Sequence, residues 1–268
     1  MTKLTILRTM APFAGALALL TQPVAAGAQD GDTPRRTRVA LGPQLVPSFP
    51  GADEVVLRPL FDFSRAEAGE EFAFEAPDES FGFSLYNDDR FAIGPAVGFE
   101  GERASEDVGG RLPEVDFTVE LGAFARYQAS ENFRLRGEVR YGVTGHEGVI
   151  AVLGGDYVMR DGDRQLISIG PRVTLTDASY QNAYFGVAPQ DAIASGLPAF
   201  DADGGVQAVG GTVGYIQQFS PRWGIYSYAK YDRLVGDAAD SPVVRQFGSR
   251  DQLSGGIALT YTFGSGLD

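Results

Sequence analysis

The sequence predicts an all-β fold: a closed, antiparallel transmembrane β-barrel of about twelve strands, with short turns at one end and longer loops at the other. The first observation is an alternation of apolar and polar residues with period 2, which places the two kinds on opposite faces of a strand. Between residues 134 and 143, for example, Leu135, Val139 and Tyr141 alternate with charged residues. The second is strand length, because many runs reach the roughly 9–11 residues that a tilted strand needs to cross a bilayer. The third is the position of aromatic residues near strand ends, as an interfacial girdle requires.

The first 28 residues have the features of a secretory signal peptide. They carry two early cations, a short apolar run over 11–20, and the sequence Ala26-Gly27-Ala28, which fits a cleavage site. A membrane anchor is the alternative, but the run is too short to span a bilayer. We therefore expect export, followed by a short N-terminal periplasmic segment over 29–36.

Turn-forming residues divide the remaining chain into twelve candidate strands. No linker or amphipathic helix of useful length separates them, so residues 37–263 are predicted to form one domain. In chain order the candidate strands cover 37–46, 54–64, 71–76, 80–87, 90–100, 115–128, 133–143, 148–160, 165–176, 205–219, 222–234 and 251–263.

The lengths of the connections fit a barrel with both chain ends on one side of a membrane. If the carboxyl terminus is periplasmic, the short turns all become periplasmic and the long connections 101–114, 177–204 and 236–250 all become external. A secreted β-sandwich or a lipocalin-like barrel shows the same alternation, but its strands are usually shorter. In lipid, a spanning sheet must close on itself to satisfy its backbone groups.

Composition argues against several classes of function. The formal net charge of −13 disfavours nucleic-acid binding, and the lack of cysteine excludes disulfides and thiolate metal sites. The single histidine, His146, is expected to be exposed in an external turn, which argues against a His-dependent nucleophile. The acidic stretches 161–163 and 201–204 lack the closing glutamate of a calcium loop. We therefore expect no cofactor, no metal site and no enzyme.

The polar face of the strands is predicted to line the lumen as a network of charges. If the hairpin around 129–132 pairs residues whose numbers sum to about 260, Glu120 faces Arg140. Two interpretations stay open: the charges fill and seal the barrel, or they form an eyelet that selects solutes. The candidate network comprises Arg58, Asp62, Asp116, Glu120, Arg126, Arg134, Arg136, Glu138, Arg140, Asp156, Arg172, Lys230 and Asp232.

Three stretches carry more than periodicity: a Pro/Gly-rich connection over 47–53, a Tyr-Phe-Gly-Val element at 184–187, and a long element over 233–244. Their combination resembles the MltA-interacting protein (MipA/OmpV) family of Gram-negative outer-membrane proteins, over essentially all of residues 37–263. The residues that carry the resemblance are Pro47, Pro50, Gly51, Asp53, Tyr184, Phe185, Gly186, Val187, Arg233, Leu234, Gly236, Asp237, Ser241 and Pro242.

This resemblance implies a barrel in the Gram-negative outer membrane with no known catalytic activity. It implies a structural or scaffolding role in the cell envelope, linked to a lytic transglycosylase and a murein synthase. A small-solute channel and a surface adhesion or ligand-binding barrel are the alternatives. The implied partners are outer-membrane lipid, the barrel-assembly machinery and the two murein enzymes, with no nucleic acid.

The carboxyl end departs from the family pattern. Tyr261 and Phe263 match the terminal aromatic signal that the assembly machinery recognises, but residues 264–268 follow it. We expect Phe263 to end the last strand and residues 264–268 to form a short periplasmic tail.

Overall fold

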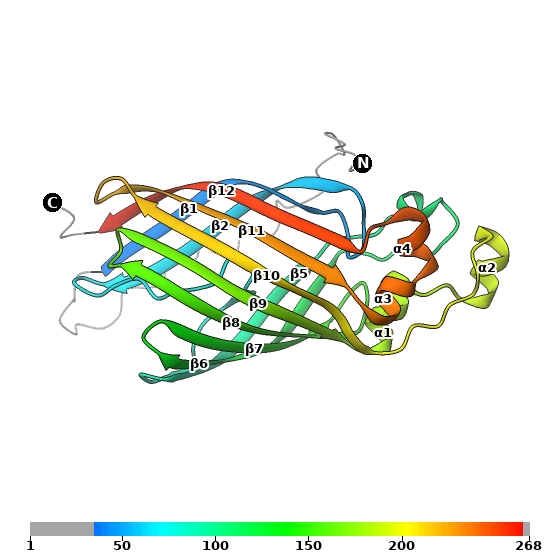
Figure 1. Cartoon of the computed structure of the whole chain (residues 1–268), viewed down its shortest axis with the longest axis horizontal. Coiled ribbons are helices and arrows are strands. Elements are labelled where there is room, and N and C mark those ends of the chain that lie inside the picture. Colours follow the sequence, from blue (N-terminus) through cyan, green and yellow to red (C-terminus); the bar gives the residue numbers. More distant parts are fainter. Residues whose placement is uncertain (1–34, 265–268) are drawn as a thin grey trace, which may run out of the picture.

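The computed structural model describes residues 35–264. The predicted signal peptide over 1–28, most of the predicted segment over 29–36 and the last four residues of the predicted tail lie outside the described residues. The described chain forms one antiparallel sheet of twelve strands, which curls into an elongated barrel (Figure 1). The structure thus confirms the predicted fold class.

Ten of the strands are long. From β5 to β12, each long strand pairs with the next one along the chain, β1 pairs with β2, and β12 pairs with β1. The pairing of β1 with β12 brings the two ends of the described chain together. The long strands are β1 (Arg35–Pro47), β2 (Val55–Glu67), β5 (Phe91–Glu100), β6 (Thr118–Ser130), β7 (Phe133–Gly142), β8 (Val149–Asp161), β9 (Gln165–Thr176), β10 (Gly205–Gln218), β11 (Trp223–Leu234) and β12 (Asp251–Gly264).

The prediction was wrong for the third and fourth strands. Residues 71–76 form no strand, and the predicted strand 80–87 is reduced to two short pieces, β3 (Phe81–Gly82) and β4 (Tyr86–Asn87), which both pair with β5. The physical reason is that backbone groups of this stretch bond to side chains and not to a neighbouring strand: the Phe72 amide donates to Asp163, and the Phe74 carbonyl accepts from Arg134. The sheet order begins at β2 and ends at β3, and within residues 35–264 no ladder joins β2 to β3, β4 or β5.

The two faces of the sheet are reversed relative to those of a water-soluble protein. Leu41 is 64% exposed on the outside, whereas Arg134 is 1% exposed on the inside. Trp223 packs edge-on against Tyr261, which packs in the same way against Phe263, with 4.6 Å between ring centroids in each pair. An apolar outer surface with aromatic residues near the strand ends is what a lipid environment requires.

The long connections fold into short helices at one end of the barrel, opposite the short turns (Figure 1). Asp177 caps α1 by accepting a hydrogen bond from the Tyr180 amide, while α2 and α4 have proline in their first turn, where its missing N–H costs nothing. None of the helices within 35–264 is long and apolar enough to cross a membrane. The helical elements are η3 (Ser105–Val108), α1 (Ala178–Phe185), α2 (Pro189–Ser195), α3 (Gly236–Asp240) and α4 (Pro242–Phe247).

Candidate functional site

Residues 71–80, the inner segment, run from the short-turn end into the barrel. At the start of the segment, the Phe72 amide donates to Asp163 Oδ1 over 2.9 Å. The Phe72 ring is 2% exposed and lies 4.9 and 4.5 Å from the guanidinium carbons of Arg36 and Arg38. Further along, the Phe74 carbonyl accepts a hydrogen bond of 2.7 Å from Arg134 Nη1. The inner segment therefore occupies the lumen, where sequence analysis predicted a wall strand.

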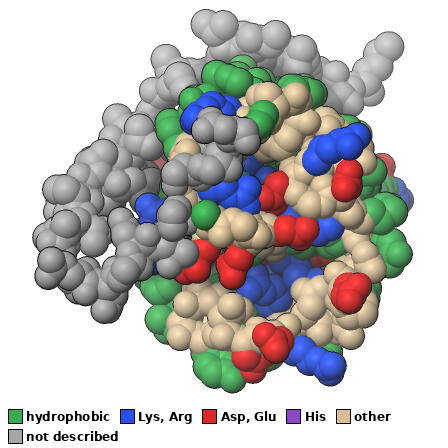
Figure 2. All heavy atoms as spheres, turned by 90° about the vertical axis from the view of Figure 1, so that its left-hand side faces the viewer, with side chains coloured by type: hydrophobic (Ala, Val, Ile, Leu, Met, Phe, Trp, Pro, Cys, Tyr) green, Lys and Arg blue, Asp and Glu red, His purple; other side chains and the backbone are tan. Residues whose placement is uncertain are grey.

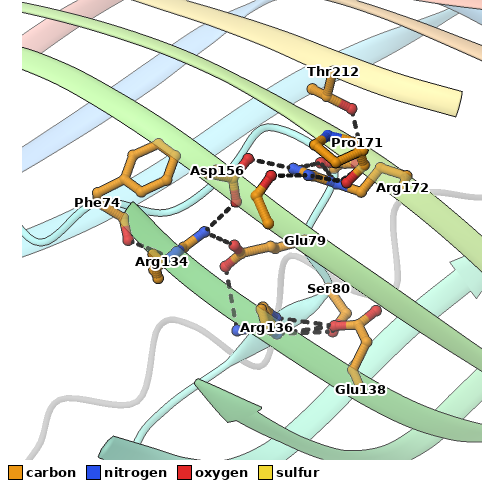
Figure 3. Close-up of polar contacts among 12 residues, drawn as sticks. Phe74, Glu79, Ser80, Arg134, Arg136, Glu138, Asp156, Pro171, Arg172 and Thr212 are labelled. Atoms are coloured by element: carbon orange, nitrogen blue, oxygen red, sulfur yellow. Dashed lines mark hydrogen bonds and ion pairs between the residues drawn. The ribbon is translucent and has the colours of Figure 1, made fainter. Parts of the chain in front are cut away.

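Two acidic side chains of the inner segment bind cations on the wall (Figure 3). Asp78 accepts from Arg172 Nε over 2.9 Å and Arg172 Nη2 over 3.0 Å, and from the Thr212 hydroxyl over 3.0 Å. Lys230 Nζ lies 3.4 Å from Asp78 Oδ2. Glu79 forms ion pairs with Arg134 and with Arg136 Nη1, the latter at 3.2 Å.

The wall itself carries a chain of ion pairs across β7, β8 and β9. Asp156 lies between two cations, with Oδ2 3.2 Å from Arg134 Nη2 and Oδ1 2.8 Å from Arg172 Nη2. Next along β7, Arg136 Nη2 lies 2.9 Å from Glu138 Oε2. Isolated buried charges cost several kcal/mol each, so this density of charge is stable only because the groups are paired.

The predicted contact between Glu120 and Arg140 is present, with 2.7 Å between Glu120 Oε2 and Arg140 Nε. Its backbone register differs from the prediction by two residues, because Gly122 lies opposite Arg140. The long side chains reach each other diagonally. Because Glu120 belongs to β6 and Arg140 to β7, this ion pair joins the two strands in addition to their backbone ladder. Arg140 also pairs with Glu138 on its own strand.

The structure leaves four of the predicted network residues outside these clusters. Arg58 donates to the Ser48 carbonyl, Arg126 to Asn87 Oδ1 at 3.3 Å, and neither lies within ion-pair distance of a carboxylate of residues 35–264. Asp62 accepts a hydrogen bond of 3.4 Å from Ser64. Asp116 precedes β6 and is exposed, so it does not face the lumen. Asp232, in contrast, pairs with Lys230 at 3.0 Å.

Sequence analysis missed the two acids that bind the wall, Asp78 and Glu79. The signal was present in the run from Glu75 to Glu79, since Pro77 cannot donate to a ladder and three carboxylates do not suit a lipid-spanning strand. The prediction of an exposed His146 was also wrong. His146 is 3% exposed, with Nε2 3.0 Å from Glu120 Oε1 and its ring 4.6 Å from that of Tyr180.

The three sequence motifs meet at the long-loop end, in a single apolar core that we call the cap. The Ser241 hydroxyl donates to the Phe185 carbonyl over 2.7 Å, which joins the second motif to the third. Gly51 in the first motif has φ +94°, and a Cβ there would lie 3.0 Å from Phe185 and Val244. The buried residues of the cap are Phe49, Ala52, Val108, Leu112, Val115, Ile150, Tyr180, Tyr184, Phe185, Val187, Ala208, Leu234, Ala238, Ala239, Val243 and Val244.

Other motif residues hold the connections around the cap. Gly236 has φ +55° at the start of α3, and the Asp237 carboxylate accepts from the Asp203 amide over 2.7 Å. Pro242 begins α4, and Arg233 pairs with Asp251 at the surface. The motifs therefore lie together at the long-loop end of the barrel, in and around the cap.

Burial sets the electrostatics of the cap. Arg103 Nη1 donates to the Tyr184 carbonyl over 2.7 Å, and burial lowers the pKa of Arg103 to about 10. The Tyr184 hydroxyl donates to the Gly101 carbonyl over 3.3 Å, and burial raises the pKa of Tyr184 well above its usual value. No group of three or more metal-ligating side chains occurs within residues 35–264.

An outward apolar face, a charged interior and long antiparallel strands define a transmembrane β-barrel of the outer-membrane class. Residues 39–263 match the model of a family described as "MltA-interacting protein MipA", and the chain belongs to this family. It is accordingly an outer-membrane protein. No curated protein sequence matches the chain.

Several solved outer-membrane proteins show a weak structural similarity to this chain at low sequence identity. A bacterial polysaccharide outer membrane secretin is 8% identical, with 87% of this chain and 100% of that chain covered and a TM-score of 0.39. OmpT of Vibrio cholerae is 8% identical, with 89% and 100% covered and a TM-score of 0.35. The channel DcaP of Acinetobacter baumannii is 8% identical, with 86% and 95% covered and a TM-score of 0.37.

Proposed function

We propose that this barrel is a structural scaffold of the outer membrane, without catalytic activity, and that it binds murein-remodelling enzymes at its periplasmic face. The observation that carries the proposal is that the barrel is obstructed twice, by the cap at one end and by the inner segment in the lumen. A barrel obstructed in this way is better suited to binding a protein at its surface than to letting solutes pass through its lumen.

The short-turn end is the surface that such an enzyme would contact. It faces the periplasm in the orientation that the connection lengths favour. Figure 2 shows charged side chains gathered in the middle of this end, with hydrophobic side chains around them. Exposed carboxylates also stand in its turns and strand ends, at Glu67, Glu131 and Asp161. The family description names MltA as an interacting protein, so a lytic transglycosylase is the proposed partner, with a murein synthase joined to the same assembly.

Co-purification with a lytic transglycosylase tests the scaffold. A variant with Glu67→Lys, Glu131→Lys and Asp161→Lys should lose most of the captured enzyme, because it reverses the charge of the short-turn end. The matched control reverses three exposed acids at the long-loop end, Glu102, Glu106 and Glu147, and should capture as much as the parent. Equal capture by both variants and the parent would exclude this docking surface.

Planar-bilayer recording separates the scaffold from a small-solute channel. The purified, folded parent protein should stay closed at moderate voltages, because the cap and the inner segment obstruct it. A steady open-channel current in the parent would overturn the scaffold proposal and favour the channel.

A further inference from the structure

We propose that the inner wall carries a binding site for a small polycarboxylate anion, and that the chain's own Asp78 and Glu79 occupy this site while the barrel is closed. The site is formed by Arg134, Arg136, Arg172, Thr212 and Lys230. This goes beyond the scaffold and does not depend on it, since it concerns the lumen and not the periplasmic surface.

The half of the site around Asp78 has the geometry of a carboxylate receptor. Arg172 binds both oxygens of Asp78 through Nε and Nη2, the two-point arrangement that a planar guanidinium forms with a carboxylate. Thr212 adds a hydroxyl donor and Lys230 a second cation. All of these groups belong to β9, β10 and β11, so the sheet holds them in place without help from the inner segment.

The other half binds Glu79 between two cations of β7. Arg134 and Arg136 both pair with Glu79, and both guanidinium side chains are at most 8% exposed. Because Asp78 and Glu79 are adjacent in the chain, the wall receives two neighbouring carboxylates at once. A single small molecule with two or three carboxylates can offer a carboxylate to each half of the site.

The inner segment is attached in a way that allows exchange. It has no ladder with any strand, and Asp78 and Glu79 bind the wall through side-chain ion pairs and hydrogen bonds. If the segment leaves, Asp156 is the one carboxylate among the described residues that still pairs with Arg134 and Arg172. Two buried guanidinium groups that share one carboxylate are under-compensated, so the empty wall attracts an anion.

A route for the ligand leads from the short-turn end. A pocket of about 230 Å³ there is lined by Phe74, Asn87, Arg90, Arg126 and Arg134, among others. Arg126 has no ion-pair partner among the described residues and can receive an anion first. Arg134 lines this pocket and also binds Glu79, so it connects the pocket to the site. The gap beside Asp78 and Glu79 is only about 20 Å³, enough for about one water, so a ligand must displace the segment.

Removing the resident carboxylates tests the site. The double variant Asp78→Asn and Glu79→Gln is titrated with citrate in calorimetry, with acetate at equal ionic strength as the comparison. We expect the variant to bind citrate at least tenfold more tightly than the parent, and acetate not detectably. The matched control removes two exposed carboxylates at the long-loop end, Glu102→Gln and Glu106→Gln, and should behave as the parent. Folding of each protein is checked by heat-modifiable migration. A folded double variant that binds citrate no better than the parent or the control would overturn the proposal.

A tether on the inner segment gives a second, independent test. The chain has no cysteine. A Cβ at residue 214 would lie 3.0 Å from Pro77 Cγ and 2.7 Å from Ser168 Oγ, so the Ser168 hydroxyl must shift when Pro77→Cys is combined with Gly214→Cys to form a disulfide. In calorimetry, citrate should bind the reduced form, and it should not bind the oxidised form detectably. Reduction of the oxidised form should restore binding. Equal binding by the two forms, or binding by neither, would show that the segment is not displaced by the anion.

Discussion

The cap and the lumen of this barrel are both buried, yet opposite kinds of contact hold them. The cap packs Tyr184 and Phe185, each 0% exposed, against apolar neighbours. The lumen pairs Arg134 and Asp156, which are equally buried. Apolar packing is non-directional, whereas each buried charge depends on a particular partner. The lumen should therefore be the less tolerant of single substitutions, and the following experiments test that difference.

Arg134→Ala should have the largest effect. It removes a cation shared by Asp156 and Glu79, and loss of one partner of a buried pair costs about 3–5 kcal/mol. The measurement is the free energy of unfolding in detergent micelles, by urea titration. Arg164→Ala is the control, because its pair with Asp161 is largely exposed and should contribute little. If the two variants are equally stable, the lumen charges do not hold the barrel.

Leu234→Ala should cost somewhat less, about 2–4 kcal/mol, through the cavity that it leaves in the cap. The effect should stay local, because the cap can loosen while the barrel ladders persist. Limited proteolysis should then cut within the connections 177–204 and 236–250 while the barrel fragment still shows heat-modifiable migration. If heat-modifiable migration is lost at the same time as the connections become cleavable, the cap and the barrel unfold as one unit.

Alkaline pH should weaken the cap. Burial raises the pKa of Tyr184, so the folded cap keeps this phenol protonated while the unfolded chain releases the proton above about pH 10. The contribution of Tyr184 to the free energy of unfolding is fully present below that pH and decreases as the pH rises further. Tyr184→Phe, followed by thermal unfolding over this range, should give a shallower decline. An unchanged slope would show that Tyr184 does not set the alkaline limit.

Arg233→Ala should have the smallest effect. Its pair with Asp251 lies at the surface, with both side chains about half exposed, and water screens such pairs. We expect no change in the melting temperature beyond experimental scatter. A clear decrease would mean that this residue of the third motif supports the cap through a contact other than the ion pair.

The predictable parts of the fold are the strands whose own sequence alternates clearly enough to show which side chains face the lumen and which face outward. The charged stripe of β7 alternates so regularly that Arg134 and Glu138 could be placed inside from sequence alone. The same reasoning gave a wrong prediction for residues 71–87, because the short apolar stretches around Phe72 and Phe81 have the pattern of a strand. Their position depends on partners such as Arg172 and Asp163, which lie far away in the chain.

The same distinction explains the long-loop end. The motifs were identifiable, but the contact between Ser241 and Phe185 joins segments 56 residues apart and has no local pattern. His146 was misplaced for the same reason. Its turn looks exposed until Tyr180 from α1 covers the ring. Contacts between distant connections follow from the three-dimensional arrangement of the strands, which single-strand periodicity does not contain.

The missing ladder beside β2 has a mechanical consequence. Elsewhere around the barrel, neighbouring strands can separate only by breaking a row of hydrogen bonds, so the perimeter is fixed. Between β2 and the pieces β3 and β4, the described residues form no such row. Slippage or widening along that line breaks no ladder, and the perimeter can change there. Such a barrel can change its circumference at this one line while all the paired strands keep their neighbours.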